Sequence, residues 1–299
     1  MDRLQAMTAF LAVADGSGFA AAARKLELSP PVVTRAVAEL EARLGVRLLT
    51  RTTRVVRVTE AGARYADDCR RILAAVGEAE AAATGTHASP RGHLTVTAPV
   101  LFGAMYVMPI VTAYLERYPE VDAACWFIDR VVNLVDEGVD VAVRIGELPD
   151  SSLHAVRVGQ VRRVICAAPA YLARCGTPAT PAELAQHRIV NAGGVTPSPD
   201  WRVNDRGSSR SVKLRPQLTT TSNDAAIAAA LSGFGLTRVL SYQVAQHLRE
   251  GRLQRVLADF EAAPLPVQVV HREGRHASQK VRAFVDAAVA ALRGEASLQ

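Results

Sequence analysis

Residues 29–45 read SPPVVTRAVAELEARLG, a serine and two prolines followed by a run with helical spacing. The apolar residues of this run recur at the spacing of one helix face: Val33, Val37, Leu40 and Leu44. The opposite face carries Pro31, Thr34, Arg35 and Ala38. Ser29 is expected to cap the helix, and the first turn tolerates proline because its amides have no intrahelical partner. The stretch therefore predicts a helix with one packed face and one exposed face.

A second helical pattern precedes this run. Residues 4–14 form an amphipathic helix, DGSG at 15–18 interrupts it, and Ser17 is expected to cap a helix through FAAAARKL. ELS at 27–29 then turns the chain into the quoted helix. This arrangement is a helix-turn-helix, although paired short helices also occur in domains that do not bind DNA.

The segment that follows is rich in arginine. RLLTRTTRVVRVT at 47–59 places arginines at 47, 51, 54 and 57 among strand-forming valine and threonine residues. That pattern suits a two-stranded wing with basic residues beside a phosphate backbone. The net charge of +6 over 299 residues permits a polyanionic partner without requiring one.

Residues 10–62 resemble the N-terminal winged helix-turn-helix of LysR-type transcriptional regulators. The shared features are paired alanines, S-x-x-x-V-[ST]-R, L-E-x-x-L-G, L-[FL]-x-R and [LV]-T-x-x-G, met almost in order. Two positions depart from the family pattern: Pro30 stands where Gln is common, and Leu49 replaces a frequent Phe. Pro30 removes a possible base-edge donor, so the operator sequence cannot be carried over from relatives.

The resemblance implies a recognition helix whose N-terminal residues approach base edges in the major groove. Pro31 and Val32 suit thymine methyl groups, and Thr34 and Arg35 suit base edges or phosphates. The wing residues Arg51, Thr53 and Arg54 are expected to contact the DNA backbone or the minor groove. The expected DNA contacts are Ser29, Pro30, Pro31, Val32, Thr34, Arg35, Arg51, Thr53 and Arg54. The alternative for each arginine is an ordinary solvated surface residue.

A long alanine-rich helix is expected over residues 59–84. Its apolar seam repeats every seven residues, as in a pairing helix: Tyr65, Cys69, Ile72, Val76, Ala79 and Ala83. The alternative is packing onto its own chain. The family resemblance implies a homodimer or homotetramer that places two DNA-binding domains on a pseudo-palindromic operator in double-stranded DNA.

From residue 93 the chain alternates between strand and helix patterns, which predicts an α/β region with mainly parallel sheets. VVNLVDEG at 131–138 is assigned to one of its helices. The region resembles the family's effector-binding part, a periplasmic-binding-protein-like pair of α/β subdomains. The expected organisation is a winged helix-turn-helix at 1–58, a linker or dimerisation helix at 59–84, a hinge at 85–92, subdomain I at 93–163 plus 268–299, and subdomain II at 164–267.

Three segments are candidate effector contacts because ligands in such folds bind beyond the carboxyl ends of strands, where helix N-termini present free amides. These segments suit a small carboxylate or another anionic metabolite. Their residues are Pro99, Val100, Leu101, Phe102, Gly103, Arg144, Ile145, Thr221, Ser222 and Asn223. The alternative is that the polar residues at the helix N-termini only bond the helix amides and that Arg144 pairs with a nearby acid.

Other functional classes have little support in the sequence. We find no G-x-S-x-G motif, no phosphate-binding loop, no strand followed by G-x-G-x-x-G, and no spacing typical of a metal site, so no catalytic residue, metal or cofactor is assigned. An α/β enzyme or a solute-binding protein with an accessory helical head remains the alternative. Without a signal peptide pattern, a cytoplasmic regulator without membrane contact is expected. Whether Cys166 and Cys175 have a redox role is left open.

Overall fold

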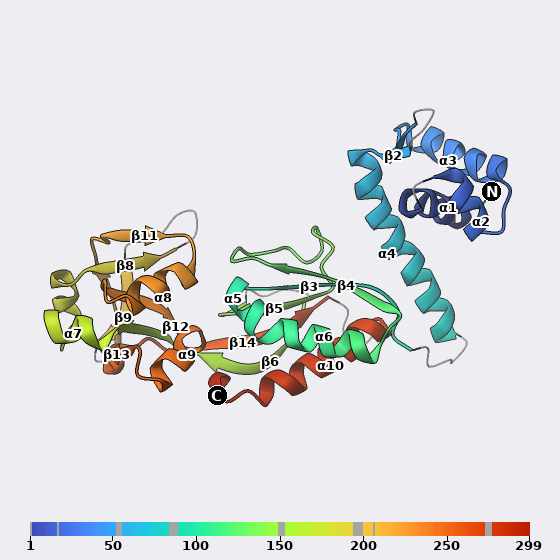
Figure 1. Ribbon diagram of the computed structural model, residues 1–299. Coiled ribbons are helices and arrows are strands. Elements are labelled where there is room, and N and C mark those ends of the chain that lie inside the picture. The colour runs from blue at the N-terminus through green and yellow to red at the C-terminus, as the bar shows by residue number, and fades with distance from the viewer. Residues whose placement is uncertain are drawn as a thin grey trace. The chain divides into compact units, whose positions relative to one another are not determined.

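The computed structural model describes residues 2–16, 18–51, 56–83, 89–148, 153–193, 200–205, 207–272 and 277–299. The chain divides into two compact units, residues 1–93 and 94–299 (Figure 1). The first unit is mostly helical and the second is α/β, which confirms the predicted fold class.

The first unit is a winged helix-turn-helix followed by a long helix. Its elements are α1 (Arg3–Asp15), α2 (Phe19–Lys25), α3 (Pro30–Leu44), β1 (Leu49–Arg51), β2 (Val56–Val58) and α4 (Glu60–Ala83). The N-cap of α2 is Gly18, which has no side chain to bond the helix amides. The predicted cap, Ser17, lies outside the described residues.

The packed face of α3 forms part of the core of this unit. Val33, Val37 and Leu40 are at most 2% exposed and share a cluster with Phe10 of α1. Leu44 was predicted on this face, but it is 41% exposed because the helix ends there, at Gly45 with a φ of 68°. Ala36, which was not predicted on this face, is buried there.

The wing is fixed to the helices by side chains that bond its backbone. The Glu41 carboxylate of α3 accepts N–H bonds from Leu48 at 2.8 Å and Leu49 at 2.9 Å. The Thr59 hydroxyl donates to the Arg47 carbonyl at 2.8 Å and accepts the Gly62 N–H at 2.9 Å. The L-E and T-x-x-G parts of the sequence pattern therefore have a structural role, namely holding the wing against α3 and α4.

The second unit contains two five-stranded sheets, each belonging to one subdomain. Sheet I has the strand order β4-β3-β5-β14-β6 and sheet II the order β11-β8-β12-β7-β13. The strands are β3 (Gly92–Ala98), β4 (Val121–Phe127), β5 (Val141–Ile145), β6 (His154–Val161), β7 (Arg163–Ala167), β8 (Ile189–Ala192), β11 (Leu218–Thr220), β12 (Leu236–Leu240), β13 (Gln254–Val256) and β14 (Leu265–His271). A separate hairpin is formed by β9 (Asp200–Asp205) and β10 (Ser208–Lys213).

Both sheets are mixed, so the prediction of mainly parallel sheets was wrong. β3 pairs with β5, and β8 with β11 and β12, in parallel. β14 and β7 run antiparallel to their neighbours on both sides. Each of these two strands directly follows a crossing of the chain from one sheet to the other.

The helices that pack beside the sheets are α5 (Val100–Phe102), α6 (Met108–Arg117), α7 (Pro169–Cys175), α8 (Asn223–Leu231), α9 (Ser241–Arg249) and α10 (Gln279–Arg293), and a π-helical turn, Gly103–Val107, joins α5 to α6. Short 3₁₀ helices lie at Pro181–Gln186, Ala258–Phe260 and Ala296–Leu298. The run Val100–Arg117 is long and apolar enough to pass a length-and-composition test for a membrane span. Its buried residues, however, join the core beside sheet I: Phe102, Val107, Val111 and Tyr114.

The boundaries between the subdomains differ from the predicted ones. β7 begins at Arg163 in sheet II, so residue 163 does not belong to subdomain I. β14 joins sheet I from Leu265, which pairs with Val161, so the chain returns before 265 rather than at 268.

Residues 131–138 do not form the predicted helix: 131–133 are irregular and 134–138 form turns. The Asn133 side chain accepts N–H bonds from Val135 at 3.0 Å and Asp136 at 3.4 Å, and this local bonding competes with helical bonding. Gly138 has a φ of 66°, which also breaks a right-handed helix.

Gly62 provides a test of how tightly α4 is held against the wing. A Cβ at residue 62 would lie 2.1 Å from the Leu48 carbonyl oxygen. Gly62→Ala should therefore lower the free energy of unfolding of the helix-turn-helix by about 1–3 kcal/mol or more, measured by urea denaturation.

Gly77→Ala is the matched control, since it is the same substitution in the same helix. A Cβ at residue 77 would have no neighbouring atom nearer than 3.9 Å, so this variant should gain up to about 1 kcal/mol from helix propensity. Equal effects of the two substitutions would contradict the close approach at Gly62.

Candidate functional site

The N-terminal end of α3 is exposed as a continuous surface. Pro30, Pro31 and Arg35 are exposed, Val32 is 41% exposed, and Thr34 is half-buried. The structure therefore brings together the six expected contacts of the helix, Ser29 included, at one end. Nothing in unit 1 covers this end in the part of the chain that the structure describes.

Ser29 occupies the predicted N-cap position, but its side chain does not bond the helix. The first two helical residues are prolines without an N–H, and the amides of Val32 and Val33 both donate to the Ser29 carbonyl, at 3.0 and 3.3 Å. The amides that commonly bind phosphate at a helix N-terminus are thus missing or already bonded here. The surface instead presents two pyrrolidine rings, an isopropyl group and the Ser29 hydroxyl.

Arg35 extends from the same surface toward the next turn of α3. Its Nε donates to Glu39 at 2.8 Å, and this bond lowers the pKa of the Glu39 carboxyl. The Arg35 side chain remains 83% exposed, and its two Nη atoms have no partner in the described residues. An exposed guanidinium held at Nε can still present its Nη edge to a phosphate or a guanine.

The wing pairs as an antiparallel hairpin in which Arg51 lies opposite Val56 and Thr50 opposite Arg57. Arg57 is exposed on this hairpin, as is Arg47 just before it. The predicted contacts Thr53 and Arg54 lie outside the described residues, as does the side chain of Arg51.

The first half of the α4 seam packs onto its own unit. Cys69 is fully buried in the helix-turn-helix core, and Tyr65 packs against that core with its ring centroid 5.8 Å from that of Phe10. Ile72, by contrast, is 42% exposed. The seam therefore changes role along the helix, from the intramolecular core near Cys69 to an uncovered surface at Ile72.

On sheet I, the predicted effector residues separate into exposed and packed groups. Pro99 and Val100 follow β3, and the Val100 N–H donates to the Asp129 carboxylate at 3.0 Å. Arg144 and Ile145 end β5, which runs parallel to β3, so both pairs lie at the same edge of the sheet.

Leu101, Phe102 and Gly103 pack inward, which corrects their assignment as effector contacts. Phe102 is fully buried, with its ring centroid 5.2 Å from that of Tyr242 in α9. Gly103 is buried against Phe127, whose ring lies 2.3 Å from where a Cβ would be. Leu101 is half-buried and packs against the cores of both subdomains, so this segment joins them.

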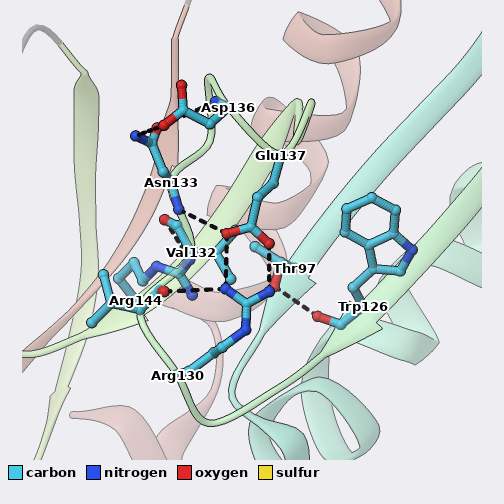
Figure 2. A network of polar contacts seen from close by, with 9 residues as sticks. Thr97, Trp126, Arg130, Val132, Asn133, Asp136, Glu137 and Arg144 are labelled. Atoms are coloured by element: carbon cyan, nitrogen blue, oxygen red, sulfur yellow. Dashed lines mark hydrogen bonds and ion pairs between the residues drawn. The ribbon is translucent and has the colours of Figure 1, made fainter. Parts of the chain in front are cut away.

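Arg144 belongs to a polar network at the edge of sheet I (Figure 2). Its Nη2 lies 3.4 Å from the Val132 carbonyl, beside a two-pronged ion pair of Arg130 with Glu137 at 2.8 and 2.5 Å. Burial lowers the pKa of Arg144, and the charge of Glu137 opposes this shift. Arg144 is therefore partly neutralised by a neighbouring acid.

On sheet II, Thr221, Ser222 and Asn223 follow β11 at the start of α8. Ser222 is the N-cap and accepts the Ala225 N–H at 3.3 Å, while Thr221 is exposed. Three polar residues of this sheet were absent from the sequence prediction: Asn191, Arg163 and Arg238. The strands β8 and β12 were not recognised, since each is short and directly follows a turn.

Cys166 and Cys175, whose redox role the sequence leaves open, lie in different surroundings. Cys166 is fully buried, and burial raises the pKa of its thiol to about 12. Cys175 is exposed at the end of α7. Among the described residues, no group of three or more histidine, cysteine, aspartate or glutamate side chains is placed to hold a metal ion.

Comparisons with known proteins agree with this architecture. Residues 4–63 match the bacterial regulatory helix-turn-helix protein model of the lysR family, and residues 87–293 match the LysR substrate binding domain. An HTH-type transcriptional regulator of Xanthomonas campestris is 35% identical over 96% of this chain and 85% of its own length. An HTH-type transcriptional repressor of Pseudomonas aeruginosa is 33% identical over 96% and 91%.

Solved structures of full-length regulators are also similar. CrgA, a LysR-type transcriptional regulator from Neisseria meningitidis, matches with a TM-score of 0.62 and 32% identity over 97% of this chain and 99% of that one. The Vibrio cholerae virulence activator AphB matches with a TM-score of 0.61 and 26% identity over 97% and 99%. The winged helix-turn-helix, the two-sheet α/β unit and these matches place the chain in the LysR family: it is a DNA-binding transcriptional regulator with an effector-binding domain, and not an enzyme.

Proposed function

We propose that the exposed N-terminal end of α3 reads the operator and that the wing holds the backbone beside it. The observation that carries this proposal is the exposure of Pro30, Pro31, Val32 and Arg35 on the face opposite the buried valines. Apolar groups in the major groove contact the thymine methyl, and arginine contacts guanine or phosphate. Arg51, Thr53 and Arg54 of the wing would add backbone contacts, which position the helix without reading sequence.

The DNA target proposed here is a pseudo-palindromic operator bound by a homodimer or a homotetramer. The exposed Ile72 on α4, beyond the part of the seam that packs internally, supports pairing through the second half of this helix. Two reading heads related by a two-fold axis require half-sites related in the same way. A regulator of this kind acts in the cytoplasm, where it meets the operator.

The proposed effector is a small anionic molecule bound between the two subdomains. Its contacts would come from the edges of the two sheets, where Val100 and Thr221 are exposed and Pro99, Arg144, Ser222 and Asn223 are half-buried. These lie at the carboxyl ends of parallel strands, where α/β folds commonly bind ligands. Binding there would shift the population of subdomain arrangements and thereby the DNA affinity.

Arg35→Ala tests the α3 assignment. The variant should bind operator DNA more weakly, by about 1–3 kcal/mol for a base contact or with a salt slope reduced by about 1 for a phosphate contact. Affinity measured by fluorescence anisotropy at several salt concentrations distinguishes these two cases, while sedimentation should report an unchanged oligomer.

Arg64→Ala is the matched control. Arg64 is 74% exposed and pairs with Glu60 one helical turn away, as Arg35 does with Glu39, but it lies on α4. If the two variants lose the same operator affinity, the loss comes from the change in net charge. That result would contradict a base-contacting role for Arg35.

Thr221→Val tests the effector assignment. In a thermal-unfolding screen against small mono- and dicarboxylic acids, the substitution should reduce the stabilisation by a hit compound and leave operator affinity without the compound unchanged. Thr112→Val, at an exposed threonine of α6, is the control and should respond as the parent does. A large loss of ligand-free DNA affinity in Thr221→Val would contradict this separation of roles.

A further inference from the structure

We infer that Arg163 and Arg238 form a binding site for a small oxyanion, a carboxylate or a phosphate group, on one face of sheet II. The inference rests on the proposed effector-binding role and specifies the chemistry of the ligand. Neither residue was among the effector contacts expected from the sequence.

The two arginines lie on neighbouring antiparallel strands. Arg238 of β12 is the register partner of Ile165 in β7, and Arg163 precedes Ile165 by two residues. Because side chains two residues apart in a strand point to the same face, both guanidinium groups leave the sheet on the same side. Arg163 opens β7 directly after the chain crosses from sheet I, so the pair lies beside the junction of the subdomains.

Trp201 holds Arg238 in a defined position. The Cζ of Arg238 lies 5.3 Å from the centroid of the indole, and its Nη1 donates to the Arg202 carbonyl at 3.1 Å. The indole is 1% exposed and donates to Asn191 Oδ1 at 3.4 Å. A guanidinium fixed in this way loses little freedom when an oxyanion binds its remaining N–H groups.

Among the described residues, no acid balances the two positive charges. Neither guanidinium has a carboxylate partner in these parts of the chain. The pKa of Arg238 is lowered to about 10, first by burial and then by the charge of Arg163. A bound oxyanion would offset this repulsion and accept several charge-assisted hydrogen bonds.

Three other arginines of the same unit have an acidic partner. Arg130 pairs with Glu137, Arg210 with Asp205, and Arg255 with Glu261. Arg163 and Arg238 are instead neighbours of each other, close enough for the charge of one to shift the pKa of the other. Their arrangement is therefore that of a site whose counter-charge comes from a ligand.

The test is thermal unfolding of the full-length protein with sodium phosphate or sodium acetate against sodium chloride at constant ionic strength. The parent should be stabilised by phosphate, by acetate or by both, which identifies the class of oxyanion. Arg163→Gln should unfold at an equal or higher temperature without the ion, since it removes a repulsion and no hydrogen bond. Arg163→Gln and Arg238→Gln should each weaken ion binding by at least about tenfold.

Arg174→Gln is the matched control, because Arg174 also lies over an aromatic ring, that of Tyr171, and donates to a backbone carbonyl, that of Gly233. This variant should retain the ion response. The inference is overturned if neither ion stabilises the parent beyond chloride, or if the Arg163 and Arg238 variants respond as the parent does. Operator affinity of the same variants, measured without added ion, separates oxyanion binding from operator binding. If the variants keep their operator affinity, the DNA-binding proposal holds whether or not the ion binds.

Discussion

The face of α3 that we propose meets DNA is determined by the face that is buried. Val33, Ala36, Val37 and Leu40 lie in the core of the helix-turn-helix, so the opposite face, with Pro31, Arg35 and Ala38, must face outward. The Glu41 carboxylate extends this constraint to the wing, because it holds the first wing strand by two backbone amides. Helix and wing are thereby presented as one rigid surface, and loss of the buried face would affect DNA binding without any change in a DNA contact.

Much of this unit could be predicted because its signals are local. The apolar spacing of α3, its paired prolines and the T-x-x-G pattern each determine a short segment, and the resemblance covers all of them. The prediction fails where local side-chain hydrogen bonds compete with helical hydrogen bonds. Residues 131–138 have helical spacing, yet the Asn133 side chain bonds the amides that a helix would need.

The effector-binding unit was harder to predict because its contacts are long-range. Phe102 follows a strand and precedes a helix, as a ligand contact would, but tertiary packing buries it against Tyr242 from a distant segment. Arg163 and Arg238 come together only through the pairing of β7 with β12, which no short sequence pattern reveals. The strand β14, which follows a crossing of the chain between the sheets, also runs antiparallel to its neighbours. The alternation of strands and helices in the sequence does not indicate this direction.

We propose that the exposed end of α3 selects a DNA sequence with two-fold symmetry. Selection of duplexes from a randomised DNA library by the purified protein, followed by sequencing, tests this most directly. The account predicts enrichment of one motif with two inverted half-sites, and altered base preference within each half-site when Pro31 and Val32 are both replaced by Ala. Retention of duplexes without any common motif, or a motif that this double substitution leaves unchanged, would contradict it.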